Sequence, residues 1–345
     1  MMMRSLIYVG PRKVEWQEVA TPKLQGDREA LVRPLAVTRC DLDYSIVHGA
    51  TGWPGPFALG HEAVGVVTDV GDAVRNFRPG DRVIVPFQLS CGTCERCRAG
   101  LTGICTTVPF RSSYGMAPLS GVDHGGALSD LMRVPFADHM LIACPEEISH
   151  VAAAGIADNV ADAYRSIAPY LGARPGARVL IVGGMGQGIG LYVAQTAKAL
   201  GAREVVYLDD HPARMALAQS LGVRVLERVT WEGAAPGAPY PITIDASGKA
   251  EGLSLAIRST EHGGVVHRSY GDLVPQTLVP LRDMYGIGMT LHLSRVHARA
   301  VMPVVTEHVR CGHLHPEHII TRQVGFSDAA EAIFDPTIKV VFLAD

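Results

Sequence analysis

The stretch Arg178-Val-Leu-Ile-Val-Gly-Gly-Met-Gly-Gln-Gly-Ile-Gly-Leu191 decides the fold class of the central part of the chain. Its apolar run, 178–182, is typical of a strand that is buried on both faces of a parallel sheet. The glycines that follow permit a tight turn and a close approach of the backbone to a pyrophosphate, and a helix that opens there would offer its free N–H groups. Because a lone glycine motif is weak evidence, the segments around it must decide its meaning.

The segments that follow alternate between strand and helix patterns. Further strand candidates are 204–209, 241–246 and 264–267, and helix candidates are 191–200 and 212–221. Strands that alternate with helices in this way predict a doubly wound parallel sheet of the α/β class. We therefore predict a Rossmann-type dinucleotide-binding domain over residues 156–294.

The N-terminal part of the chain has a different character. Short apolar runs such as 29–37 and 63–70 are bounded by Gly, Pro and Asp, which is typical of strands joined by turns. The tail returns to mixed short elements after the α/β pattern ends. We therefore predict a second, β-rich domain formed by residues 1–155 and completed by residues 295–345.

Bulk composition excludes several classes of protein. The 345 residues carry a net charge of −3, and 48% are hydrophobic against 19% charged, which gives no sign of a nucleic-acid partner. No run of 18 apolar residues predicts a membrane-spanning helix, and the N-terminus lacks the apolar core of a signal peptide. We expect a cytoplasmic protein without membrane or nucleic-acid partners.

Four cysteines form the sharpest local motif. Cys91-Gly-Thr-Cys94-Glu-Arg-Cys97 is followed by Cys105. Four thiolates at such short spacings can enclose one tetrahedral zinc ion, which then has no open position and holds a loop instead of doing chemistry. A redox pair and an iron–sulfur cluster are the alternatives. Cys144 and Cys311 lie in apolar stretches and are expected to be inert small hydrophobic residues.

A second set of potential metal ligands lies upstream. Cys40 occurs in Thr38-Arg-Cys-Asp-Leu-Asp43, and His61 and Glu62 occur in Leu59-Gly-His-Glu-Ala-Val-Gly65. A Gly-His-Glu tripeptide is weak evidence alone, but the cysteine cluster follows it by about thirty residues. Gly80-Asp81-Arg82-Val83, Gly125-Gly126-Ala127 and the nucleotide-binding half complete a series of motifs in a familiar order. With them the chain resembles, nearly end to end, the zinc-containing medium-chain alcohol dehydrogenases (the medium-chain dehydrogenase/reductase family).

The resemblance implies a GroES-like, β-barrel-type catalytic domain and a catalytic zinc bound by Cys40 and His61. It assigns Asp158, in Ala157-Asp-Asn-Val160, as the third ligand, although an aspartate before a helix can also be an N-cap. Glu62 matches the glutamate that approaches the metal, and Asp43 the carboxylate that orients the zinc-bound histidine. Two zinc ions per chain are therefore expected, one catalytic and one structural.

The resemblance also implies the residues that bind the nicotinamide cofactor. They are Gly183, Gly184, Gly186, Gly188, Ile189, Gly190, Asp209, Arg214 and Ser247. Asp209 ends the second predicted strand, where a carboxylate can bind both ribose hydroxyls and repel a 2′-phosphate, so NAD(H) is expected to be preferred. Arg214 matches a family position whose basic side chain also reaches the adenosine ribose, so binding of NADP(H) stays possible. Asp209 could alternatively only end the strand or cap the helix that begins at Pro212.

One position departs from the family pattern. The residue two after the zinc cysteine usually carries a hydroxyl that passes the alcohol proton towards solvent, but here it is Leu42, which cannot carry a proton. Tyr44, Ser45, His48 or a bound water could replace it. The reaction could instead be reduction of an activated C=C or C=N bond, or catalysis could have been lost and only nucleotide binding kept.

These observations predict a zinc-dependent oxidoreductase that transfers a hydride between NAD(H) and an alcohol, aldehyde, ketone or imine. Trp53, Phe110 and Tyr114 match family positions that line the substrate pocket. The stretch 284–293 matches the edge strands that relatives pair between subunits, so a homodimer or homotetramer is expected. The histidines of Gly312-His-Leu-His-Pro-Glu-His318 are expected in an exposed loop without a metal.

Overall fold

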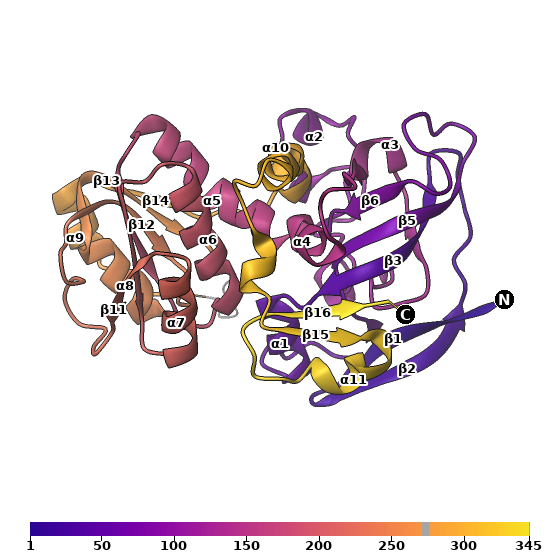
Figure 1. The fold of residues 1–345 in the computed structure, drawn as a ribbon, viewed down its shortest axis with the longest axis horizontal. Helices are drawn as coiled ribbons and strands as arrows, with labels where there is room; N and C mark the ends of the chain where they lie inside the picture. Colours follow the sequence, from indigo (N-terminus) through magenta and orange to yellow (C-terminus); the bar gives the residue numbers. More distant parts are fainter. Residues whose placement is uncertain (271–275, 345) are drawn as a thin grey trace. The chain divides into compact units, whose positions relative to one another are not determined.

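The computed structural model describes residues 1–270 and 276–344 (Figure 1). The chain divides into two compact units. Unit 1 comprises Met1–Ala161, Arg295–Gly312 and Ile320–Asp345, and unit 2 comprises Asp162–Ser294 and His313–Ile319. The division falls within one helix, α5 (Asn159–Ala173), so no separate linker marks it.

Unit 2 contains a sheet in which, over the described residues, six strands run parallel in the order β11-β10-β9-β12-β13-β14. The strands are β9 (Arg178–Val182), β10 (Glu204–Asp209), β11 (Arg224–Glu227), β12 (Tyr240–Asp245), β13 (Thr260–Arg268) and β14 (Thr290–His292). The order reverses at β9, which lies between β10 and β12. The predicted doubly wound parallel sheet is therefore confirmed. Ligands of such sheets bind at the carboxyl ends of the strands beside the reversal, and the glycine turn follows β9 at that position.

Helices cover this sheet in Figure 1. They are α6 (Gln187–Ala199), α7 (Pro212–Ser220), α8 (Ala250–Arg258) and α9 (Leu281–Ile287). Strand residues such as Leu180 and Val206 are buried with Ile257 of α8 in one core. Helix α6 begins at Gln187, earlier than the predicted residue 191. Its glycines allow the helix to pack closely on the sheet, since a Cβ on Gly190 would lie 3.3 Å from the Ala246 Cβ.

Unit 1 is built mainly on antiparallel strands, although β15 and β16 pair in parallel. Its larger sheet has the order β15-β16-β3-β5-β6-β8, with β7 also paired to β3, and a smaller sheet has the order β2-β1-β4. The strands are β1 (Met2–Gly10), β2 (Lys13–Ala20), β3 (Ala30–Thr38), β4 (Phe57–Ala58), β5 (Glu62–Val70), β6 (Arg82–Val85), β7 (Met132–Val134), β8 (Ile142–Ala143), β15 (Arg322–Gly325) and β16 (Val340–Leu343).

Short helices connect these strands. They are α1 (Asp41–Val47), α2 (Glu95–Arg98), α3 (Ala137–Met140), α4 (His150–Ala154), α10 (Ala298–Arg310) and α11 (Ala329–Ala332), with 3₁₀ turns η1 (Thr102–Ile104), η2 (Ala117–Leu119), η3 (Gly155–Ala157) and η5 (Phe326–Asp328). A further turn, η4 (Pro316–Ile319), belongs to unit 2. Within the described ranges, none of the helices is long and apolar enough to span a bilayer.

Candidate active site and cofactor sites

Backbone pairing in unit 1 brings together residues that are far apart in the sequence. Strands β3 and β5 pair antiparallel with Thr38 opposite Glu62. Cys40, just after β3, and His61, just before β5, therefore lie at the same end of this strand pair. Strand β16 pairs with the other edge of β3, with Val341 opposite Thr38. The ends of three strands therefore meet around one buried point.

Four predicted residues converge at this point. Cys40, His61, Glu62 and Asp158 are all buried, and each offers a ligand atom within 4.8 Å of the others. The Nε2 atom of His61 lies 3.5 Å from Oδ2 of Asp158. Asp158 ends turn η3 and directly precedes α5, but its carboxylate faces His61 and accepts a hydrogen bond from the Asn159 side chain. This arrangement favours a ligand role for Asp158 over a helix cap.

Asp43 fixes the direction of the His61 ring. Its Oδ1 lies 3.2 Å from His61 Nδ1, and its Oδ2 accepts the Cys40 backbone N–H at 2.9 Å. Both side chains are almost completely buried. With Nδ1 turned to the carboxylate, Nε2 is the nitrogen presented to the cluster, as expected for a metal-binding histidine supported by a carboxylate.

Without a bound ion, burial and the neighbouring charges favour the protonated forms of Cys40, Glu62 and His61. Burial, with the charge of Asp158, raises the pKa of the Cys40 thiol to about 12, and burial raises the pKa of Glu62 to about 7. Burial lowers the pKa of His61, but the charge of Asp43 and hydrogen bonds from its neighbours outweigh it and leave the pKa well above its ordinary value. The close grouping of sulfur, nitrogen and carboxylate donors fits a zinc ion. The charge of a bound ion would favour the deprotonated forms of these ligands.

Three further residues support this cluster, and none of them was predicted from the sequence. The fully buried Lys339 donates to Glu62 Oε2 at 2.8 Å and to Asn159 Oδ1 at 2.8 Å. Asn159 in turn donates to Cys40 Sγ at 3.3 Å and to Asp158 Oδ2 at 3.1 Å, and the Thr38 hydroxyl donates to Glu62. Lys339 had a signal in the sequence, because it is a lone charge at the start of an apolar strand.

The candidates for a replaced proton relay lie on α1. Tyr44 stacks on His48 with ring centroids 4.1 Å apart, and His48 Nδ1 lies 2.9 Å from the Tyr44 carbonyl. The Ser45 hydroxyl donates to the Asp41 carbonyl at 3.3 Å. These contacts hold the three side chains within the helix and its surroundings. The relay role therefore stays a prediction for each of them.

Two of the pocket positions are placed differently from expectation. Tyr114 has no exposed surface and its hydroxyl donates to the Arg133 carbonyl, so the prediction that it lines a pocket is wrong. Phe110 is exposed and borders a cavity of about 480 Å³ beside the cysteine cluster, together with Arg96 and Ile104. Trp53 packs edge-on against Phe57.

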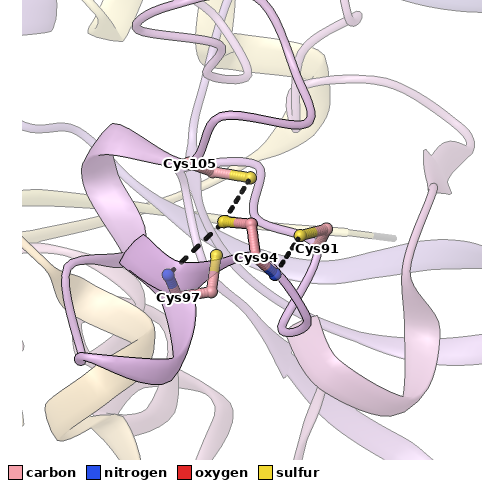
Figure 2. A group of neighbouring side chains, drawn as sticks. All are labelled: Cys91, Cys94, Cys97 and Cys105. Atoms are coloured by element: carbon pink, nitrogen blue, oxygen red, sulfur yellow. Dashed lines mark hydrogen bonds between the residues drawn. The ribbon is translucent and has the colours of Figure 1, made fainter.

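The four cysteines of the predicted structural zinc site face one another (Figure 2). The backbone N–H of Cys94 donates to Cys91 Sγ at 3.3 Å, and that of Cys97 donates to Cys94 Sγ at 3.5 Å. Cys94 Sγ lies 3.9 Å from Cys105 Sγ, far beyond a disulfide bond. Hydrogen bonds from Thr106 and Cys97 lower the pKa of Cys94 to about 5, which favours its thiolate. The cluster fits a structural zinc site.

The other cysteines differ from each other. Cys144 is buried, as expected of a small hydrophobic residue. Cys311 is exposed at the end of α10, and its thiol lies 3.2 Å from a Glu307 carboxylate oxygen. The expectation of an apolar environment for Cys311 is therefore wrong, because the apolar face of α10 ends before it.

In unit 2 the glycine turn follows β9 and lies against the end of β12. The Met185 N–H donates to the Ser247 carbonyl at 2.9 Å, and the Gly186 N–H to the Ala246 carbonyl at 3.0 Å. A Cβ on Gly184 would lie 2.6 Å from the Ser247 carbonyl oxygen, so glycine is required there. Gly188, Ile189 and Gly190 lie in the first turns of α6. The structure thus places Ser247 beside the predicted phosphate turn.

Asp209 lies at the end of β10, next to the same turn. It is fully buried, and a Cβ on Gly183 would lie 2.3 Å from its carboxylate. Arg214 binds both its oxygens, each at 2.7 Å, and the Tyr207 hydroxyl donates at 2.9 Å. Burial raises the pKa of Asp209, but Arg214 more than offsets this, so the pKa is lowered and the carboxylate stays charged.

Comparisons with known proteins identify the family of this chain. The alcohol dehydrogenase GroES-like domain matches residues 26–146, and the zinc-binding dehydrogenase domain matches residues 188–271. A glutathione-independent formaldehyde dehydrogenase of Pseudomonas aeruginosa is 34% identical over 65% of this chain, which spans only 58% of that protein. An L-threonine 3-dehydrogenase of Chelativorans sp. is 31% identical over 77% of this chain and 76% of its own length.

Among solved structures, the alcohol dehydrogenase TADH from Thermus sp. ATN1 superposes with a TM-score of 0.89 at 29% identity, covering 99% of this chain and all of that one. The match therefore includes both units and the segments that carry the two metal clusters and the glycine turn. The chain belongs to the zinc-containing, medium-chain alcohol dehydrogenase family.

Proposed function

We propose that the protein is a zinc-dependent oxidoreductase that transfers a hydride between NAD(H) or NADP(H) and an alcohol or carbonyl substrate. The observation that carries the proposal is the convergence of Cys40, His61 and Asp158 on one buried point. A panel of alcohols, aldehydes and ketones, assayed with all four cofactor forms, tests it. Oxidation or reduction of at least one substrate that stops on chelation supports the proposal, and no turnover by fully zinc-loaded protein contradicts it.

The chain's own residues prepare this site for such chemistry. A bound zinc ion would supply Lewis acidity to the substrate oxygen. Asp43 holds the ring of His61, and Asn159 holds the thiol of Cys40 and the carboxylate of Asp158 in a fixed relation. Lys339 donates to both carboxylate oxygens of Glu62, and we propose that this ion pair holds Glu62 away from the zinc. The fourth position is thereby reserved for substrate or water.

The relatives suggest the size of the substrate. One similar protein is named for formaldehyde and others for L-threonine, which are small polar molecules. We propose a small alcohol, aldehyde or ketone for this chain. Zinc ligation by four thiols also supports a cytoplasmic location, because thiols stay reduced there.

A second candidate activity is reduction of an activated C=C or C=N bond. Leu42 favours it, because such reductions do not need a hydroxyl that relays the proton of an alcohol. The panel of substrates therefore also includes enones and cyclic imines. Turnover of these alone would replace the first proposal with the second.

The Leu42→Thr variant tests whether the site lacks only a proton carrier. We expect alcohol oxidation to rise by about tenfold or more, because general acid–base assistance contributes at least that much to proton-transfer steps. Leu42→Val is the matched control, since it changes the side chain without adding a hydroxyl. Equal rates for both variants and the wild type would mean that another group already carries the proton.

We further propose that NAD(H) is preferred, with Arg214 moderating the preference. The carboxylate of Asp209 repels a 2′-phosphate, but Arg214 already neutralises much of its charge. In the Asp209→Asn variant the buried Arg214 would be free to bind that phosphate, so we expect the KM ratio of NADPH to NADH to fall by about tenfold. Asp283→Asn, which removes an exposed carboxylate of unit 2 paired with Arg258, should leave the ratio unchanged. An unchanged ratio in the first variant contradicts the assignment of Asp209.

We propose that the protein is a homo-oligomer. Strand β14 is the last strand of its sheet in the described residues, and large apolar side chains nearby are exposed, among them Leu281, Tyr285 and Leu293. Such an open edge with apolar neighbours suits pairing with a second copy. Sedimentation velocity should give a dimer or tetramer, and Leu291→Pro within β14 should shift it towards monomer. A monomeric wild type contradicts the proposal.

A further inference from the structure

A third group of metal-ligating side chains lies outside the sites described above. His315, Glu317 and His318, in and beside turn η4 of unit 2, offer two imidazole nitrogens and a carboxylate oxygen within 4.8 Å of one another. His315 Nδ1 lies 3.3 Å from Glu317 Oε1, and the rings of His315 and His318 stack with centroids 4.8 Å apart.

The backbone that carries these side chains is firmly held. Leu314, Pro316 and Ile319 are buried, so the three polar side chains between them are left towards the outside. The side-chain amide of Gln195 on α6 binds the backbone of His315 twice, donating to its carbonyl at 2.9 Å and accepting its N–H at 3.1 Å. A rigid turn of this kind keeps potential ligands close before any ion binds, which lowers the entropic cost of binding.

The donor set selects a class of ion. Two imidazoles and one carboxylate suit divalent transition metals such as zinc and nickel, whereas magnesium prefers oxygen ligands alone. Ligand atoms of a tetrahedral zinc site lie about 3.4 Å apart, given metal–ligand bonds of about 2.1 Å. The side chains of His315 and Glu317 are 46% and 37% exposed, so small rotations can bring them to this spacing.

We propose that His315, Glu317 and His318 form a third metal site, separate from the two zinc sites, that binds a divalent transition-metal ion with water completing its coordination. This revises the expectation that the histidines of this loop are only exposed side chains. The ion would link side chains within turn η4, whose backbone Gln195 of α6 already holds, and would take no part in hydride transfer.

The test uses full-length protein that retains its zinc, titrated with Ni²⁺ and followed by calorimetry and metal analysis. Metal analysis of the same samples shows whether both zinc ions are retained, and Ni²⁺ bound in addition to them reports the new site. We expect one Ni²⁺ per chain, with affinity lowered about 100-fold in His315→Ala and in His318→Ala and about tenfold in Glu317→Gln. His262→Ala, which removes an exposed histidine of β13, is the matched control and should bind as the wild type does.

Several outcomes would overturn the proposal. They are a wild type that binds no Ni²⁺, histidine variants that bind it as the wild type does, and equal loss in His262→Ala. Binding of Mg²⁺ as tight as that of Ni²⁺ would also contradict the role of the imidazoles. Unchanged zinc content and unchanged oxidoreductase activity in the variants would show that they fold, and would separate this test from that of the proposed function.

Discussion

Asp158→Ala is expected to leave the protein with about one zinc ion per chain and to lower kcat/KM by about 1,000-fold or more, since Lewis-acid stabilisation by a metal is worth several kcal/mol. The carboxylate lies 3.5 Å from His61 Nε2 and within ligand distance of Cys40, so its loss leaves two protein ligands instead of three. Metal analysis and steady-state kinetics on the same preparation measure both effects.

Asp158→Cys is the informative control for this experiment. Many relatives of the family have cysteine as the third ligand, and a thiolate supplies the same charge at this position. Zinc content should return to about two per chain in this variant, together with part of the activity. If Asp158→Ala keeps its full zinc content, Asp158 is not a ligand, and the proposed catalytic zinc site is wrong.

The sequence predicted the parallel sheet well because local pattern and tertiary environment agree there. The apolar run Arg178–Val182 became β9 and Glu204–Asp209 became β10 without any shift in their bounds. A strand that is buried on both faces is recognisable in the sequence as a continuous run of hydrophobic residues. Helix α6 begins at Gln187, earlier than predicted, because glycines are unfavourable in a helix and hide its first turn in the sequence. Gly190 allows close packing there, since an added Cβ would lie 3.3 Å from the Ala246 Cβ.

The metal clusters were predictable for a different reason. Cys91, Cys94, Cys97 and Cys105 are close in sequence, so their spacing alone indicates a shared ion. Cys40, His61 and Asp158 are far apart, and only the resemblance to a family connected them. The pairing of β3 with β5 brings Cys40 to His61, and turn η3, which ends at Asp158, packs against β5.

Residues that act through long-range contacts were not predictable. Lys339 reaches Glu62 because β16 pairs with β3, and no local pattern indicates which strands from opposite ends of a chain will pair. Tyr114 failed as a pocket residue for a similar reason, since its burial depends on the Arg133 segment that accepts its hydrogen bond. A lone lysine in an apolar strand indicates a buried partner but does not identify it.

Lys339→Met is expected to be the most destabilising single change at the site, with a loss of about 3–5 kcal/mol in the free energy of unfolding, because it leaves Glu62 buried without its cation. Lys339 has no exposed surface, and methionine fills a similar volume, so the loss reports charge and not a cavity. Denaturant unfolding of the metal-free protein measures it. The Glu62→Gln/Lys339→Met double variant is the control, and it should recover most of the stability because no buried charge remains.

The loss in Lys339→Met should also depend on pH with a definite sign. The pKa of Glu62 in the folded metal-free wild type is already raised to about 7 by burial, and Lys339 holds it down. Without Lys339 it rises further. A carboxyl whose folded pKa lies above its unfolded value loses stability as the pH rises through the folded pKa, so the deficit of the variant against the wild type should widen above about pH 7. Above about pH 7 the deficit of the double variant should stay flat, because it has no carboxyl at position 62 left to ionise. A deficit in Lys339→Met that is independent of pH would mean that packing, and not the Glu62 charge, is what Lys339 supports.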